Sequence, residues 1–204
     1  VVADLQVQYF AAGADITELA KLDTLKAKVF INRGLSVINR LTELPIPVIA
    51  AVNGAAAGAG ANLAFACDIV LAARSAVFIQ AFCKLGLMPD CGGSHFLPRL
   101  AGTARALGLA LTGDRLPADQ AESWGLIWKC VDDDRLMPEA EALAARFAQG
   151  PPLGYAATKR TLYASAANTL EQQLDLERDT QRELGRSEDY REGVEAFMEK
   201  RPPA

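Results

Sequence analysis

The sequence predicts an α/β core followed by a purely helical segment. Short apolar runs alternate with helical patterns from residue 47 to about residue 150, whereas only helical periodicity follows the Gly150-Pro151-Pro152 break. The chain has 204 residues, half of them hydrophobic, which is long enough to bury a real core. Alternating strands and helices followed by helices alone are typical of an α/β domain with a helical extension. We therefore expect a core over residues 1–150 and a helical segment over 151–204.

The first part of the chain predicts one strand and one long helix. Leu5, Val7 and Tyr9 alternate with polar residues as in a strand, which leads into the small-residue turn FAAGADI at 10–16. A helical pattern then runs over 17–43 and ends before Pro45.

The middle of the chain contains the most informative stretch, PVIAAVNGAAAGAG at 47–60. It predicts a buried strand over 47–53, a tight turn at Asn53-Gly54 and a loop of Gly and Ala that opens a short apolar helix over 60–67. Strands over 69–73 and 77–80 follow.

The remaining elements are predicted mainly by their ends. Helices are expected after Gly93, over 104–113 and from Pro117 to Gly125, since proline favours a helix start and glycine a helix end. A strand over 126–131 and a helix over 135–148 complete the core. In the C-terminal segment, Thr169 with Gln172 forms a capping box, and Ser187 begins the last helix.

Composition excludes several classes of protein. The net charge of −4 argues against a general nucleic-acid surface. No apolar run approaches the ~20 residues that span a bilayer, and no secretory signal is visible. Four cysteines without CxxC spacing and a single histidine predict no metal site, but reduced and mostly buried thiols in a cytoplasmic protein.

Two small-residue turns point to chemistry. A Gly/Ala loop lets a ligand approach the backbone, and a helix start presents N–H groups that lack intrahelical partners. Two such donors, one from FAAGADI and one from AAAGAG, can form an oxyanion hole that stabilises an enolate derived from a thioester. Each turn alone is more often a packing device.

Taken together, these segments resemble the crotonase (enoyl-CoA hydratase/isomerase) superfamily. The likeness covers the whole chain and includes AGAD, IPVIAAVNG, ANLAFACDIVLA, the PDCGG turn and LPRLAGTARALGLALTG. It implies a spiral of ββα turns whose C-terminal helices build a homo-oligomer, a trimer or a dimer of trimers. It also implies an acyl-CoA thioester substrate, with coenzyme A as part of the substrate and no separate cofactor. Because related chains have further strands before AGAD, we expect the N-terminal part to be missing.

The resemblance also assigns site residues. The backbone N–H groups of Ala14 and Ala59 match the oxyanion donors, and Asp90 matches the carboxylate of the isomerases. The remaining positions expected to bind substrate are Ala12, Asp15, Ile16, Gly58, Gly60, Asn62, Phe82, Leu87 and Pro89. Lys159 and Lys200 match helices that contact the cofactor portion of the substrate, and His95 is expected at a surface or interface.

The carboxylates favour an isomerase. Hydratases of the superfamily use two glutamates, because water must be deprotonated while carbon receives a proton. The matching positions here hold Asn62 and Phe82, which leaves Asp90 as the one nearby acid. One carboxylate suffices for a 1,3-proton shift. The competing interpretation is that Asp90 only caps the helix that begins at Gly92-Gly93.

Longer segments, AFCKLGLMPDCGG and NTLEQQLDLERDTQRELGRSEDYREGVEAF, resemble one branch of the superfamily, the ring-1,2-epoxyphenylacetyl-CoA isomerases of phenylacetate degradation. The expected function is therefore an acyl-CoA isomerase acting on such an epoxide or a related enoyl-CoA. Two alternatives stay open: an enoyl-CoA hydratase in which Asp90 alone activates water, and a catalytically idle subunit that binds acyl-CoA or supports assembly.

Overall fold

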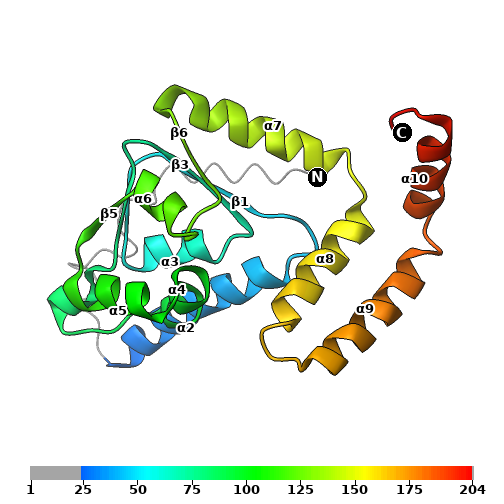
Figure 1. The fold of residues 1–204 in the computed structure, drawn as a ribbon. Coiled ribbons are helices and arrows are strands. Elements are labelled where there is room, and N and C mark those ends of the chain that lie inside the picture. The colour runs from blue at the N-terminus through cyan, green and yellow to red at the C-terminus, as the bar shows by residue number, and fades with distance from the viewer. Residues whose placement is uncertain (1–23, 204) are drawn as a thin grey trace. The chain divides into compact units, whose positions relative to one another are not determined.

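The computed structural model describes residues 24–203 and contains the expected α/β core followed by helices (Figure 1). These residues form two compact units, one of residues 24–43 and 48–145 and the other of residues 44–47 and 146–203. The predicted first strand, the FAAGADI turn and the start of the first helix lie outside the described residues. The remainder of that helix is α2 (Thr24–Glu43).

The first unit contains a parallel sheet of three strands. Strand β3 (Ile69–Ala73) lies in the centre and pairs with β1 (Ile49–Val52) and with β6 (Lys129–Val131). Central parallel strands are covered on both faces, which explains the uninterrupted apolar sequence IVLAA of β3. β6 is shorter than the strand predicted over 126–131.

A second sheet of three strands is only partly as predicted. Strand β4 (Val77–Ile79) pairs in parallel with β2 (Ala55–Ala57) and antiparallel with β5 (Arg115–Pro117). The sequence predicted a loop where β2 lies and no strand at β5. Alanine is a weak strand former and each strand has three residues, so pairing with β4 rather than local preference creates both.

The helices of the first unit follow the predicted order. Besides α2 they are α3 (Ala59–Phe65), α4 (Gly93–Ala101), α5 (Thr103–Thr112), α6 (Ala118–Ser123) and most of α7 (Leu136–Ala148), whose last three residues belong to the second unit. Two short 3₁₀ helices, η1 (Ala81–Leu85) and η2 (Asp133–Arg135), were not predicted. As expected, Gly125 follows the end of α6 with a positive φ of 76°.

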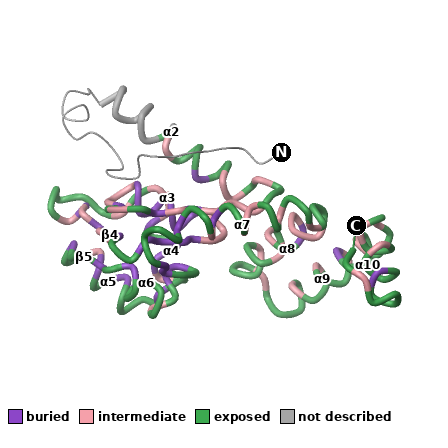
Figure 2. Tube along the Cα trace, turned by 90° about the horizontal axis from the view of Figure 1, so that it is seen from above, coloured by how far each residue is buried: buried purple, intermediate pink, exposed green. Residues whose placement is uncertain are grey.

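The core of this unit is rich in alanine. Ala56, Ala61, Ala64 and Ala72 are fully inaccessible, which allows α3 to lie close to the strands around it. Figure 2 shows the buried residues gathered around α3, α4 and the strands, whereas α9 and α10 are mostly exposed.

The second unit consists mainly of α8 (Pro152–Ala164), α9 (Leu170–Leu184) and α10 (Glu188–Glu199). The predicted capping box is confirmed: the Gln172 N–H donates to Thr169 Oγ1 (3.3 Å), and the Thr169 N–H donates to Gln172 Oε1 (2.9 Å). Ser187 caps α10 as predicted. None of the helices within residues 24–203 is long and apolar enough to cross a bilayer.

Candidate active site

The turn between β2 and α3 presents a helix start. Gly58 has φ 55° and ψ −125°, a conformation that a residue with a Cβ rarely adopts, and its N–H donates to the carbonyl of Ile79 (2.8 Å). The first bond within α3 runs from the Asn62 N–H to the carbonyl of Gly58 (3.2 Å). The N–H groups of Ala59 and Gly60 therefore precede the helical ladder and have no partner inside the helix.

Phe82 packs beside this turn. It lies in η1, directly after β4, and its side chain is buried. A Cβ placed on Gly58 would lie 3.6 Å from Cζ of Phe82, in ordinary van der Waals contact. The chain then passes through the exposed Leu87 and the half-buried Pro89 to reach Asp90. An apolar ring thus borders the helix start, with no ionisable group at position 82.

Asp90 begins a tight turn that leads into α4. The Gly93 N–H donates to the Asp90 carbonyl (2.8 Å), and the two residues between them have positive φ, 46° for Cys91 and 80° for Gly92. The Asp90 side chain is exposed. The N-cap residue of α4 is Gly92, and no side-chain hydrogen bond from the described residues, Asp90 included, caps this helix. The interpretation of Asp90 as a helix cap is therefore wrong.

Asn62 ties α3 to this turn. Its side chain is completely buried, its Nδ2 donates to the Asp90 carbonyl (2.8 Å), and its Oδ1 accepts from Nε2 of Gln80 (2.9 Å). The sequence did not single out Gln80, because a glutamine at the end of a strand carries no local signal of a role in a site.

The turn also perturbs a thiol. Burial raises the pKa of Cys91 to about 12, and the neighbouring Asp90 carboxylate adds to the effect. Cys91 is half-buried and packs against the core. Of the four free cysteines only Cys130 is buried, so the expectation of mostly buried thiols was wrong. His95 is exposed, and partial burial together with Arg99 lowers its pKa.

Within the described residues, six of the twelve predicted site positions lie close together. Gly58, Ala59, Gly60, Asn62, Phe82 and Asp90 are connected through α3, η1 and the turn before α4. The predicted positions Ala12, Ala14, Asp15 and Ile16 lie outside the described residues. Within residues 24–203 no three His, Cys, Asp or Glu side chains are grouped as metal ligands.

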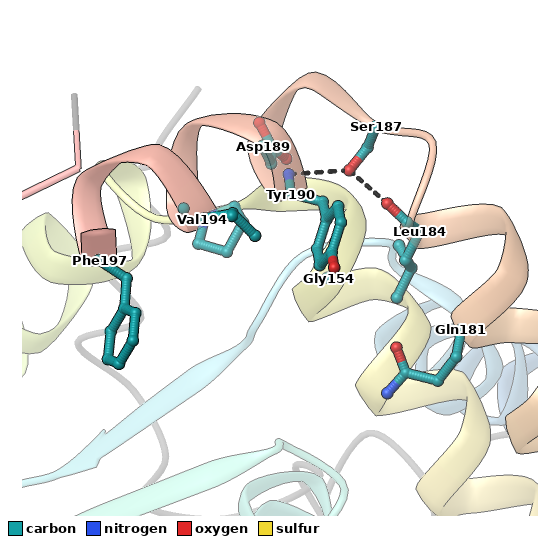
Figure 3. Close-up of a pocket in the computed structure, with 10 residues that line it drawn as sticks. Gly154, Gln181, Leu184, Ser187, Asp189, Tyr190, Val194 and Phe197 are labelled. Atoms are coloured by element: carbon teal, nitrogen blue, oxygen red, sulfur yellow. Dashed lines mark hydrogen bonds between the residues drawn. The ribbon is translucent and has the colours of Figure 1, made fainter. Parts of the chain in front are cut away.

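A separate groove of about 570 Å³ lies in the second unit, between α8, α9 and α10. Ser187 stands where α9 meets α10: its hydroxyl donates to the carbonyl of Leu184 (2.7 Å) and accepts from the N–H of Tyr190 (3.1 Å) (Figure 3). The lining is largely apolar and includes Val194 and Phe197. None of the predicted substrate-binding residues that the structure describes lines this groove.

Comparison with known proteins decides the family. The pattern of the enoyl-CoA hydratase/isomerase family matches residues 1–204. This protein belongs to that family. It is 58% identical to 1,2-epoxyphenylacetyl-CoA isomerase of Escherichia coli K12, over 95% of this chain and 76% of that protein. It is 35% identical to trans-2-decenoyl acyl-carrier-protein isomerase of Streptococcus mutans, over 95% of this chain and 75% of that protein.

A solved structure agrees with the fold. The crystal structure of an enoyl-CoA hydratase from Bacillus anthracis aligns with a TM-score of 0.90 at 32% identity, over 94% of this chain and 74% of that one. The predicted crotonase-like fold is therefore confirmed, as is the assignment to hydratases and isomerases that act on acyl-CoA substrates.

Proposed function

We propose that this enzyme is an acyl-CoA isomerase in which Asp90 moves a proton between two carbons of the substrate. The observation that supports it best is the set of side chains around the start of α3. Asp90 offers an exposed carboxylate that caps no helix, whereas positions 62 and 82 hold a buried amide and a buried aromatic ring. Isomerisation needs one acid–base group, and this arrangement provides one.

The backbone stabilises the intermediate. Removal of a proton next to the thioester places negative charge on the thioester oxygen, and preorganised N–H donors lower the energy of that charge. We assign one donor to Ala59 at the start of α3, where no intrahelical acceptor competes. The second donor, Ala14, lies outside the described residues. With an enoyl-CoA substrate, Asp90 then returns the proton to a different carbon of the acyl chain, so the double bond moves and no net atoms are gained or lost.

The substrate is proposed from likeness. The 58% identity to an enzyme named 1,2-epoxyphenylacetyl-CoA isomerase supports that epoxide, or a related enoyl-CoA, as the substrate. Coenzyme A enters as part of the substrate, and no separate cofactor is required by a proton shift. An enzyme with this role would act in phenylacetate breakdown, in the cytoplasm.

The decisive experiment replaces Asp90 by asparagine. Asp90→Asn keeps the size and the polarity of the side chain but removes its basicity. We expect acyl-CoA binding to persist and isomerisation to fall by about 10²–10⁴, the usual contribution of a positioned general base. Turnover of 1,2-epoxyphenylacetyl-CoA and of a panel of enoyl-CoA thioesters is followed by mass spectrometry and NMR, with deuterium exchange in D₂O. Full turnover by the variant would refute the role of Asp90.

A hydratase is the second candidate, because the chain also aligns with the Bacillus anthracis enoyl-CoA hydratase. In that case Asp90 would activate water without a second carboxylate. Crotonyl-CoA separates the two activities, since hydration adds the mass of one water and isomerisation leaves the mass unchanged. Binding of acyl-CoA without any turnover across the panel would instead identify a catalytically idle subunit.

We also propose that the enzyme is a homo-oligomer, a trimer or a dimer of trimers built through its C-terminal helices. The support is the apolar surface that these helices leave open. Phe197 is 82% exposed and Met198 75% exposed on α10, and Leu170 is 76% exposed at the start of α9. Large apolar side chains that remain this exposed are frequent at association sites.

A further inference from the structure

We infer that Asn62 and Gln80 are positioning residues for Asp90 and that neither touches the substrate. The inference rests on the proposed function of Asp90 as the proton shuttle. Two hydrogen bonds in series support it. The buried Gln80 donates to Asn62, and Asn62 donates to the backbone carbonyl of the exposed Asp90.

The two amides are sealed inside the protein. Asn62 is 0% exposed and Gln80 2% exposed. Gln80 Nε2 donates to Asn62 Oδ1 (2.9 Å), which orients the amide so that Nδ2 of Asn62 donates to the Asp90 carbonyl (2.8 Å). The oxygen and the nitrogen of the Asn62 amide are thereby both engaged with the protein, so the residue acts on the reaction through Asp90.

The Asp90 carbonyl receives two donors from different elements. One is the Gly93 N–H within the turn (2.8 Å), and the other is the amide of Asn62 on α3 (2.8 Å). Cys91, the next residue, has a positive φ of 46°, a conformation that costs free energy for a residue other than glycine. The bond from Asn62 counters relaxation of this turn. A fixed backbone at Asp90 limits where its carboxylate can reach.

The packing at Gly93 shows that α3 fits closely against the turn before α4. A Cβ on Gly93 would overlap with Nδ2 of Asn62, far inside van der Waals contact. Any larger residue at position 93 would displace the amide that holds Asp90.

The side chain of Gln80 includes a polar atom that destabilises the folded state. Its Oε1 is buried and has no hydrogen-bond partner among residues 24–203. A buried acceptor without a partner destabilises a fold, so stability alone does not explain a glutamine at this position. The Nε2 of Gln80 accounts for the glutamine at this position, because this donor fixes the orientation of the Asn62 amide.

The test replaces the donor of Asn62 by an acceptor of the same shape. Asn62→Asp still accepts from Gln80 but sets a carboxylate oxygen against the Asp90 carbonyl. We expect kcat to fall by about 10–100-fold, because small displacements of a catalytic group lower the rate by such factors. KM and the binding of an unreactive acyl-CoA should change by less than about twofold. Unchanged kcat in a folded variant would overturn the inference.

A double variant separates positioning from other effects. If Asn62 acts only through Asp90, then Asn62→Asp in an Asp90→Asn background lowers the residual rate no further. Losses that multiply would overturn the inference. Full turnover in Asp90→Asn alone would instead refute the proposed function, so the two failures are distinguishable.

The second unit offers a matched control. Asn168 Nδ2 donates to Gln173 Oε1 (2.9 Å), and Gln173 Nε2 donates to the carbonyl of Thr161 (3.1 Å). Gln173→Glu therefore also sets a carboxylate against a carbonyl, but far along the chain from Asp90. We expect kcat to stay unchanged in this control, and an equal loss in both variants would overturn the inference.

Gln80→Met provides a second test of the inference if Asn62→Asp does not fold. Methionine has a similar length and removes the unpartnered oxygen together with the donor to Asn62. We expect a folded protein whose kcat falls while its KM is kept. A folded Gln80→Met variant with the parent kcat would contradict the inference.

Discussion

At the scale of single residues, the pair Asp90 and Cys91 shows how a neighbour changes reactivity. Burial contributes most to the raised pKa of the Cys91 thiol, and the Asp90 carboxylate contributes next because a thiolate beside it would place two negative charges together. The thiolate is the nucleophile, so Cys91 should react slowly with electrophiles although it is only half-buried.

The raised pKa of Cys91 can be tested without measuring turnover. With a pKa of about 12, the alkylation rate of Cys91 by iodoacetamide should keep rising with pH beyond 9, where an ordinary thiol levels off. Asp90→Asn should lower the pKa and speed alkylation at pH 8. Peptide mass spectrometry measures both rates, with Cys130 as the internal control. An Asp90→Asn variant with an unaltered Cys91 rate would show that the carboxylate does not act on this thiol.

At the scale of elements, the feature of α3 that bears on catalysis is its first turn and not the length of the helix. Gly58 turns the chain so that Ala59 is the first helical residue, and the backbone N–H of Ala59 is then free of helical bonding. Proline is well tolerated at this first helical position. Gly58, with ψ −125°, is also outside the helical conformation that a following proline disfavours.

Ala59→Pro should therefore remove the donor while it leaves α3 intact. We expect turnover to fall by about 10²–10³, the usual effect of losing one oxyanion donor, with little change in the thermal unfolding midpoint. Ala59→Ser keeps the N–H and serves as the matched variant, with a much smaller expected loss. A folded Ala59→Pro enzyme with the parent turnover would mean that the oxyanion donor lies elsewhere.

At the scale of the whole molecule, the two units differ in how completely they cover their apolar residues. Among the described residues, the first unit holds nearly all of the buried apolar side chains, whereas the second buries only Ala157 and Ala196 and leaves Leu174, Val194 and Phe197 exposed on α9 and α10. Helices with uncovered apolar faces gain stability from association, which is the reason to expect an oligomer.

Replacing one exposed aromatic ring tests this expectation. Phe197→Ser removes apolar surface that is 82% exposed, so we expect a smaller oligomer, or a weaker one, by size exclusion with light scattering. Glu195→Ser is the matched control, because it makes the same helix substitution at an exposed polar residue of α10. The same oligomer in both variants would argue against association through Phe197.

Features that depend on neighbours in sequence were predictable. The capping box of Thr169 and Gln172 spans three residues, and the N-cap at Ser187 likewise, so local hydrogen bonding determines both. The parallel strands β1 and β3 were visible as apolar runs. Strands β2 and β5 were not, because they exist through their pairing with β4 and have little strand preference of their own.

The sequence by itself determined the fold class, the small-residue turn that starts α3 and the presence of one carboxylate where a pair would serve hydration. Only the tertiary structure showed that the Asp90 carboxylate does not cap α4, since the N-cap residue of this helix is Gly92. It alone also joined Gln80, Asn62 and Asp90, which are separated by 18 and 28 residues along the chain. Hydrogen bonds between buried amides depend on the approach of whole elements, and no local pattern of residues records that approach.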